Sequence, residues 1–300
     1  MKHVLSVSIG SSSRNHKAEV ELLGERVMVE RRGTDGDIDA AVKLIEELDG
    51  KVDAFGMGGI DLYLISRGRR YVMRDAKRIL DAAQKTPIVD GSGLKNTLER
   101  KIISELAGNV IDFKGKNVLV TAGVDRFGMA ESFEETGCNL ILGDLIFALG
   151  IPIPIRSVKS LDGFARVLAP VVTKLPFSIL YPTGDRQNES TPKHGKYFEW
   201  ADIIAGDFLF IKRYMPQRLD GKIIITNTTT AKDVEDLKER GVEMLVTTTP
   251  VLEGRSFGTN VMEAVLLAVS GQRDLTPQEY LSLLERMQFR PRVVDFKQAC

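Results

Sequence analysis

The feature that most constrains the fold of this chain is a pair of short apolar runs, each of which ends in a cluster of threonines. Lys222–Ile225 runs into Thr226–Thr230, and Met244–Val246 runs into Thr247–Thr249. A helical pattern follows each cluster. Short runs rich in Ile and Val that alternate with segments of 3.6-residue periodicity are typical of buried parallel strands in βαβ units. The pattern predicts an open α/β sheet in this part of the chain.

The two threonine clusters are expected to lie at the same edge of that sheet, because parallel strands of one sheet point their carboxyl ends the same way. Open α/β sheets bind their ligands at this edge. Hydroxyl groups and helix N-terminal amides suit phosphate, ribose or carboxylate oxygens. We therefore interpret Thr228, Thr248 and Thr249 as cofactor-binding candidates. The alternative is that these threonines only cap the helices that follow.

The rest of the chain divides into two kinds of pattern. The N-terminal part is rich in strand patterns, with an alternating run at Val4–Ile9 and hairpin connections at Gly24 and Gly68. From Thr86 onward, strands and helices alternate. We predict an α/β fold with a mixed β-rich N-terminal domain, residues 1–113, and a mostly parallel, Rossmann-like domain, residues 114–300. The aperiodic polar tract 183–196 predicts a long loop.

Composition and charge limit the partners of the chain. Its 41 acidic and 41 basic residues cancel, which argues against a nucleic-acid binder driven by charge. No apolar stretch approaches the roughly 20 residues of a membrane span, and the N-terminus lacks a signal-peptide pattern, so we predict a cytoplasmic protein without a membrane partner. The two cysteines, Cys138 and Cys300, have no metal-site spacing, and no metal is predicted. A homodimer is possible, because dimers are the default among soluble enzymes.

The first candidate site is the turn between a strand that ends at Asp90 and the helix that follows. Two glycines flank Ser92 in this turn, and Lys95 and Asn96 follow on the first helical turn. Glycine permits a close approach of the backbone to a ligand. We predict that Lys95 and Asp90 form a catalytic acid–base couple and that Ser92 and Asn96 bind substrate. The alternative is an ordinary connection with Lys95 in solvent.

The second candidate site is the turn after the strand at residues 117–121. Gly123, Asp125 and Arg126 stand where a dinucleotide-binding turn would lie, and we interpret them as cofactor-binding candidates. The G-x-G-x-x-G fingerprint is absent, because Gly123 and Gly128 are five residues apart. Arg126 suits a phosphate at the start of a helix. The alternative is that it pairs with Asp125 or Glu131.

Two further loops carry residues that suit anions. Arg255 lies between two glycines before a helix, and we predict that it holds a substrate carboxylate through paired hydrogen bonds. The alternative is that Arg255 is only a surface residue beside Glu253. The serine-rich segment Gly10–Arg14 could also bind an anion, but a turn of this composition after a strand is more often only a turn.

The segments Asp90–Arg100 and Thr248–Ala264 together resemble a group of bacterial proteins commonly labelled quinate 5-dehydrogenase. The resemblance to quinate and shikimate dehydrogenases implies two α/β domains, NAD or NADP as cofactor, and a catalytic Lys–Asp pair in the N-terminal domain. The glycine-rich cofactor turn of that family and its Asn-Val-Thr-x-Pro-x-Lys segment have no match in this sequence. Lys95 could take the role of the lysine, with either Asp90 or Asp125 as the acid, but no motif match assigns these residues.

The function expected from this resemblance is hydride transfer between a nicotinamide cofactor and a small hydroxylated carboxylate. A lysine would exchange the hydroxyl proton while an arginine holds the carboxylate. The alternative from another class is a non-redox regulatory protein that binds a nucleotide or a sugar phosphate. A third interpretation is a kinase or other transferase, based on the glycine-containing segments Gly10–Arg14 and Gly56–Asp61.

Overall fold

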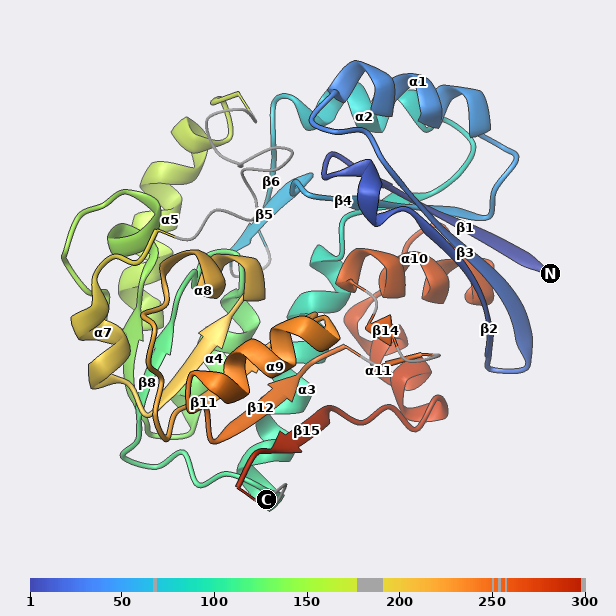
Figure 1. The fold of residues 1–300 in the computed structure, drawn as a ribbon. Helices are drawn as coiled ribbons and strands as arrows, with labels where there is room; N and C mark the ends of the chain where they lie inside the picture. The colour runs from blue at the N-terminus through green and yellow to red at the C-terminus, as the bar shows by residue number, and fades with distance from the viewer. Residues whose placement is uncertain (67–68, 177–190, 250, 253–254, 257, 298–300) are drawn as a thin grey trace. The chain divides into compact units, whose positions relative to one another are not determined.

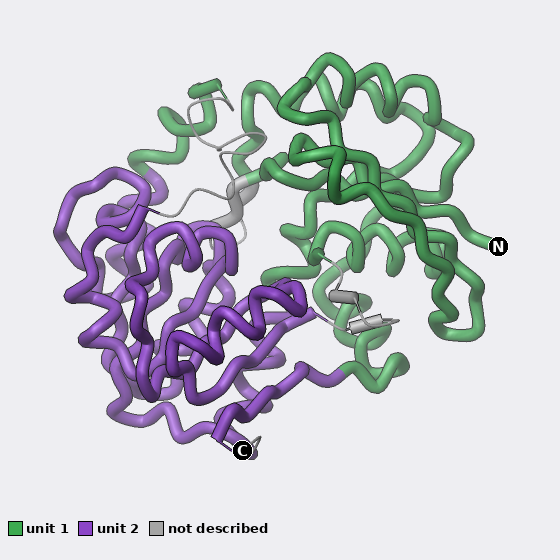
Figure 2. The backbone as a smooth tube through the Cα atoms, in the orientation of Figure 1, with its two compact units in different colours: residues 1–97, 167–187, 257–289 green, residues 98–166, 188–256, 290–300 purple. Residues whose placement is uncertain are grey.

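The computed structural model describes residues 1–66, 69–176, 191–249, 251–252, 255–256 and 258–297. The chain forms two compact units (Figure 2). Unit 1 comprises residues 1–97, 167–187 and 257–289, and unit 2 comprises residues 98–166, 188–256 and 290–300. The sequence-based division has a single boundary after residue 113, whereas each unit is assembled from three separate segments.

The sheet of unit 1 has five strands in the order β2-β3-β1-β4-β7. They are β1 (Lys2–Ser8), β2 (His16–Leu22), β3 (Glu25–Gly33), β4 (Ala54–Gly58) and β7 (Ile88–Val89). Only the β2–β3 pair is antiparallel among these neighbours. The carboxyl ends of β1, β3, β4 and β7 therefore share one edge of the sheet.

Helices cover both faces of this sheet. Figure 1 shows α1 (Ile38–Leu48) and α2 (Ala76–Ala82) on one face and α10 (Thr259–Ser270) on the other. Side chains alternate between the two faces along β1, so Leu5 and Val7 share the face covered by α1 and α2. There they pack with apolar residues of both helices. The other described elements of unit 1 are η1 (Ser12–Arg14), the hairpin of β5 (Tyr63–Ser66) and β6 (Arg69–Val72), and α11 (Pro277–Arg286).

Unit 2 contains a six-stranded sheet in the order β15-β12-β11-β10-β8-β9. Its strands are β8 (Asn117–Val120), β9 (Asn139–Leu142), β10 (Ile203–Gly206), β11 (Ile223–Thr226), β12 (Met244–Thr247) and β15 (Arg292–Asp295). All neighbours are parallel except β15, which runs antiparallel to β12. This is the open, mostly parallel arrangement that the strand–helix alternation predicts.

Connections between these strands are mostly helical. They are α4 (Phe127–Glu135), the π-helix η2 (Asp144–Ala148), α5 (Val158–Val172), α7 (Gly195–Trp200), α8 (Phe208–Tyr214) and α9 (Ala231–Glu239). The helix α3 (Ser92–Asn109) begins in unit 1 and ends in unit 2, and β13 (Val251–Leu252) pairs with β14 (Arg255–Ser256). One apolar cluster joins Phe198, Phe208 and Leu237 of the helices to Ile204 and Ile224 of the sheet.

The predicted α/β fold class is confirmed, and so is the hairpin at Gly24, which joins β2 to β3. The N-terminal sheet is nevertheless mostly parallel, and β15 at the edge of the second sheet has no counterpart in the prediction. Residues 183–190 of the predicted loop lie outside the described residues, while Gly195 and Lys196 begin α7. Within the described ranges, none of the helices combines the length and apolar character needed to cross a bilayer.

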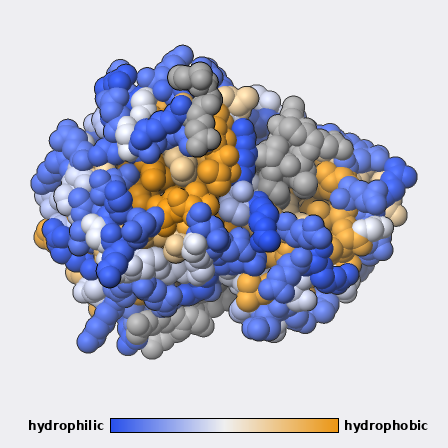
Figure 3. All heavy atoms as spheres, turned by 90° about the horizontal axis from the view of Figure 1, so that it is seen from below, coloured by the Kyte–Doolittle hydropathy of each residue, from blue (hydrophilic) through white to orange (hydrophobic). Residues whose placement is uncertain are grey.

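Apolar side chains also reach the surface. Figure 3 shows one face on which apolar patches lie among hydrophilic side chains. The exposed large apolar residues of α5 are Phe164, Val167 and Val171. Because much of any folded surface is apolar, exposure of this kind does not by itself assign a function.

Candidate functional site

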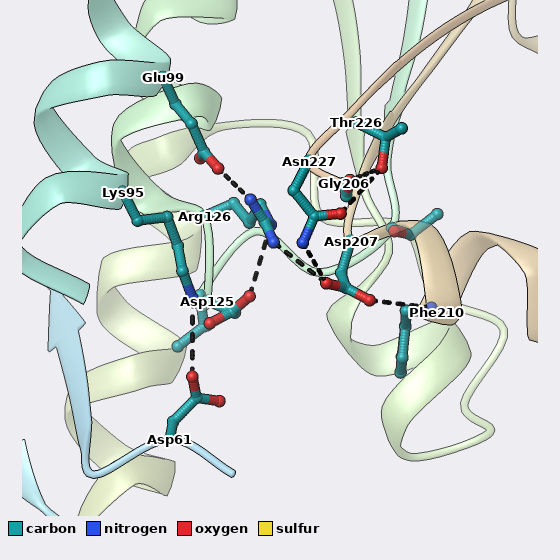
Figure 4. Close-up of polar contacts among 12 residues, drawn as sticks. Asp61, Lys95, Glu99, Asp125, Arg126, Gly206, Asp207, Phe210, Thr226 and Asn227 are labelled. Atoms are coloured by element: carbon teal, nitrogen blue, oxygen red, sulfur yellow. Dashed lines mark hydrogen bonds and ion pairs between the residues drawn. The ribbon is translucent and has the colours of Figure 1, made fainter. Parts of the chain in front are cut away.

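The carboxyl edge of the unit 2 sheet gathers polar side chains from several strand ends. Asp125 and Arg126 follow β8, Asp207 follows β10, and Asn227 follows β11. Figure 4 shows the side chains of Arg126, Asp207 and Asn227 directed toward one another. Because β8, β10 and β11 are parallel neighbours, residues far apart in the chain meet at this edge.

Arg126 is the centre of this arrangement. Its guanidinium forms ion pairs with Glu99, with Asp125 at 3.5 Å and with Asp207 at 3.3 Å. The side chains of Arg126 and Glu99 are each 2% exposed. Burial opposes the charge, but the carboxylates of Glu99, Asp125 and Asp207 raise the pKa of Arg126 above its ordinary value. The guanidinium is thus compensated within unit 2, so the pairing alternative describes it better than a phosphate-binding role.

The turn at Gly123 is occupied by a carboxylate of the protein itself. The backbone amides of Gly123 and Val124 donate to the two carboxylate oxygens of Asp144, at 2.9 and 2.8 Å. Burial raises the pKa of Asp144 to about 6, although these hydrogen bonds act in the opposite direction. A cofactor pyrophosphate would need the same amides. The Gly123 turn, as folded, does not fit the phosphates of a dinucleotide.

Asp207 and Asn227 are held in fixed orientations. One carboxylate oxygen of Asp207 accepts from the amides of Leu209 and Phe210, at 2.9 and 3.2 Å, and thereby caps α8. The other accepts from the Asn227 side-chain amide at 2.7 Å. The Asn227 side-chain oxygen in turn accepts from the amide of Phe208 at 3.1 Å. The side chains of Asp207 and Asp125 are 33% and 27% exposed, so their carboxylates reach solvent.

The threonine clusters lie at this same edge, as the sequence predicts, and they connect the strand ends to each other. The hydroxyl of Thr226 donates to the carbonyl of Gly206 at 2.7 Å, and that of Thr249 donates to the carbonyl of Asn227 at 2.9 Å. Thr228 lies 3.5 Å from Thr249, measured between hydroxyl oxygens. Thr248 and Thr249 are buried. These contacts give the hydroxyls a structural role.

The helix-capping alternative holds at one position of the first cluster. The hydroxyl of Thr230 accepts from the amide of Asp233, and the Asp233 carboxylate accepts from the amide of Thr230. This reciprocal pair is a capping box at the start of α9.

The predicted acid–base couple in unit 1 has a different arrangement. Among the described residues, the Lys95 ammonium lies within ion-pair distance of Asp61, at 3.6 Å. The Asp90 carboxylate accepts from the backbone amides of Leu62, Tyr63 and Ser92, at 2.6, 3.1 and 2.9 Å. Asp90 therefore holds two chain segments together, and Lys95 is paired with another acid.

The predicted substrate-binding residues are spread over both units. Ser92 is the buried first residue of α3, and Asn96 lies partly buried one turn later. Arg255 lies in β14, opposite Leu252, and its side chain lies outside the described part of the structure. No contact among the described residues brings these three together.

Glu263 is a buried acid to which the sequence analysis assigns no role. Its side chain is 3% exposed, and one carboxylate oxygen accepts from the Tyr280 hydroxyl at 2.7 Å and from the Leu94 amide at 3.2 Å. Burial, together with the charge of Asp90, raises the pKa of Glu263 to about 7. The available signal was its position as a single charged residue in the otherwise uncharged helix α10.

In the part of the chain that the structure describes, no group of three or more His, Cys, Asp or Glu side chains is arranged to hold a metal ion. The carboxylates near Arg126 are arranged around a guanidinium. Carboxylate groups of this kind are hydrogen-bond acceptors, and hydroxyl or amine groups are suitable donors to them.

Comparisons with known proteins give distant structural similarity. No curated protein matches the sequence. A periplasmic ribose ABC transporter from Conexibacter woesei is 11% identical, with a TM-score of 0.41, over 99% of this chain and 92% of that chain. A carbohydrate transporter solute binding protein from Agrobacterium Radiobacter, in complex with D-arabinose, is 11% identical, with a TM-score of 0.38, over 92% and 90%. Glutamate dehydrogenase from Thermus thermophilus is 12% identical, with a TM-score of 0.43, over 96% and 73%.

The geometry corrects one prediction. The expected oxidoreductase of the quinate or shikimate dehydrogenase type is wrong, because the amides of the Gly123 turn, where a dinucleotide would bind, hold Asp144, and Lys95 is paired with Asp61.

Two family models match the sequence and together cover most of it. Residues 3–90 match a domain of unknown function (DUF8753). Residues 93–296, more than half of the chain, match a second model, and the chain therefore belongs to the family described as Domain of unknown function (DUF8754).

Proposed function

We propose that unit 2 binds a small polyhydroxylated molecule, such as a neutral sugar, without redox chemistry. The observation that carries this proposal is the pair of Asp207 and Asn227 at the carboxyl edge of the sheet, with Asp125 on the neighbouring turn. Carboxylate and amide oxygens accept hydrogen bonds from sugar hydroxyls. Binding sites of open α/β sheets lie at this edge.

The charge of the edge favours a neutral ligand over a phosphorylated one. In the described part of unit 2, three carboxylates, those of Glu99, Asp125 and Asp207, surround the Arg126 guanidinium. Like charges repel a phosphate at short range. Hydroxyl groups instead donate to the carboxylates without adding charge. Among the ligands of a non-redox binding protein, we therefore propose unphosphorylated sugars and not sugar phosphates.

The acceptors are also held rigidly, which lowers the entropy that a ligand must remove on binding. Asp207 is fixed by the amides of Leu209 and Phe210, and Asn227 by the amide of Phe208. Preorganisation of this kind is expected of a binding site built on strand ends.

The test is a thermal-unfolding and calorimetric titration of the full chain with D-ribose, D-arabinose, D-ribose 5-phosphate, NAD⁺ and NADP⁺. The two neutral sugars follow the names of similar structures. We expect at least one neutral sugar to bind and to be preferred over ribose 5-phosphate. The same titrations test whether the protein binds NAD⁺ or NADP⁺. Binding of a nicotinamide cofactor remains a prediction.

The matched variants are Asp207→Asn at the carboxyl edge and Asp220→Asn, which removes an exposed carboxylate before β11. We expect Asp207→Asn to weaken sugar binding by about tenfold, the loss typical of one charged hydrogen bond, and Asp220→Asn to leave it unchanged. Tighter binding of the phosphorylated sugar, or equal effects of the two variants, would contradict the proposal.

A further inference from the structure

Arg31 of unit 1 is a half-buried cation whose hydrogen bonds go to uncharged groups. It lies on β3 opposite Ser6 of β1. Its guanidinium donates to the Ser11 carbonyl at 3.0 Å, to the Asn15 side-chain oxygen at 3.4 Å and to the Ser8 hydroxyl at 3.0 Å. These three bonds use part of the five N–H donors of an arginine. The other donors of the guanidinium take no part in these three bonds.

The segment that surrounds Arg31 is held firmly by the end of β3. The amide of Thr34 donates to the Ser8 carbonyl at 2.8 Å, and the amide of Gly36 donates to the Ile9 carbonyl at 2.7 Å. The amide of Gly33 donates to the Asn15 side chain at 2.6 Å. A Cβ on Gly33 would lie 2.6 Å from the Gly10 carbonyl oxygen, so glycine is needed for this close approach. The carbonyl and hydroxyl groups around the guanidinium therefore keep fixed positions.

The electrostatic environment of Arg31 is deficient in negative charge. Burial and the neighbouring Arg14 lower the pKa of Arg31 to about 10, whereas Asp35 acts in the opposite direction. The Asp35 carboxylate is itself engaged by the Ser12 amide at 2.6 Å. Two arginines and one aspartate leave one positive charge in excess at the carboxyl edge of β1 and β3. A half-buried guanidinium is stabilised when an oxyanion binds it through paired hydrogen bonds.

We propose that Arg31, with Arg14 and the serine segment 11–13, forms a binding site in unit 1 for an oxyanion group, either a phosphate or a carboxylate of a small molecule. The segment follows a strand of a parallel sheet, where ligands of such sheets bind. The site goes beyond the proposed sugar site because it lies wholly within unit 1 and has the opposite charge. The outcome for one site therefore does not decide the outcome for the other.

The experiment is a calorimetric titration of the full chain with inorganic phosphate and, separately, with acetate, at ionic strength held constant with sodium chloride. Arg31→Gln removes the central donor, and Arg14→Gln removes the exposed neighbour without touching the strand pairing. Arg26→Gln is the matched control, because Arg26 lies on the same strand and pairs with Glu19 at the surface. Near-ultraviolet circular dichroism confirms that each variant is folded.

We expect saturable binding of phosphate, acetate or both to the wild type, with the better probe identifying the class of oxyanion. Arg31→Gln should weaken it by about tenfold, as expected for loss of a charge-assisted pair. Arg14→Gln should weaken it less, and Arg26→Gln should have no effect. If Arg31→Gln fails to fold, Arg14→Gln decides the result. The inference is overturned if neither anion binds the wild type more tightly than chloride, or if all three variants bind as the wild type does.

Discussion

At the scale of single residues, unit 2 depends on the balance of charge around Arg126. Arg126→Met leaves the buried Glu99 carboxylate without this countercharge, so we expect a loss of about 3–5 kcal/mol in the free energy of unfolding. Urea unfolding followed by circular dichroism measures it. Arg218→Met is the control, because Arg218 and Asp220 form a solvent-exposed pair and should matter little. Equal losses from the two substitutions would show that Arg126 has no special role.

Gly91 and Gly24 provide a second comparison between single residues. Both have positive φ, +93° and +82°, but a Cβ on Gly91 would lie 2.7 Å from the backbone nitrogen of Asn260, whereas Gly24 has open space. Gly24→Ala should cost about 1 kcal/mol for the left-handed backbone alone. Gly91→Ala should cost distinctly more, because the start of α10 must move. Urea unfolding measures the loss of unfolding free energy in each variant. Similar losses in Gly24→Ala and Gly91→Ala would contradict the close packing of Gly91 against α10.

At the scale of elements, Glu263 links α10 to the start of α3 and makes stability depend on pH. The pKa of Glu263 is about 7 in the fold, above the ordinary value of 4.5, so the folded state binds more protons between these values. The contribution of Glu263 to the free energy of unfolding is therefore complete below about pH 4.5 and is lost as the pH rises through about 7. The loss is roughly 3 kcal/mol at most. Asp144, with its pKa raised to about 6, contributes in the same direction.

Glu263→Gln imitates the protonated acid, so we expect a flatter dependence of stability on pH. The urea midpoints of the wild type and of the variant should coincide near pH 5, and the variant should have the higher midpoint near pH 8. The contribution of Asp144 remains in both proteins and serves as the internal reference. A variant whose profile parallels that of the wild type would mean that Glu263 titrates normally.

At the scale of the whole molecule, the sequence order of the chain differs from its spatial division. The helix α10 covers one face of the unit 1 sheet, although residues 98–166 and 188–256 of unit 2 precede it in the chain. A fragment of residues 1–113 lacks α10 and leaves the Gly56 side of the sheet uncovered. We expect this fragment to lose cooperative unfolding in urea, because it cannot bury that face. A sharp transition comparable with that of the full chain would refute this expectation.

The elements themselves were largely predictable, because their signals are local. The apolar runs before Thr226 and Thr247 identify β11 and β12, and the helical pattern after the first threonine cluster identifies α9. The shared edge of the threonine clusters follows from parallel pairing. The short edge strand β15 has only four residues, too few for a periodic pattern.

The partners within each site were not predictable from the sequence, because they are separated by long stretches of chain. Arg126 meets Glu99 and Asp207 across 27 and 81 positions, and Asp144 reaches the Gly123 amide across 21. The sequence offers the nearby acids Asp125 and Glu131 as partners of Arg126, but it does not show that Glu99 and Asp207 also pair with it. These carboxylates are the reason why we propose a neutral hydroxylated ligand for this edge of the sheet.

Sugar binding by unit 2 is tested most directly by titration of the ¹⁵N-labelled protein with D-ribose and D-arabinose, followed through backbone amide chemical shifts. We expect saturable shifts concentrated on the amides of Asp207–Phe210 and on Asn227, at the strand ends that carry the acceptors. Absence of any saturable shift, or shifts that leave these amides unchanged, would contradict the assignment of a sugar site to unit 2.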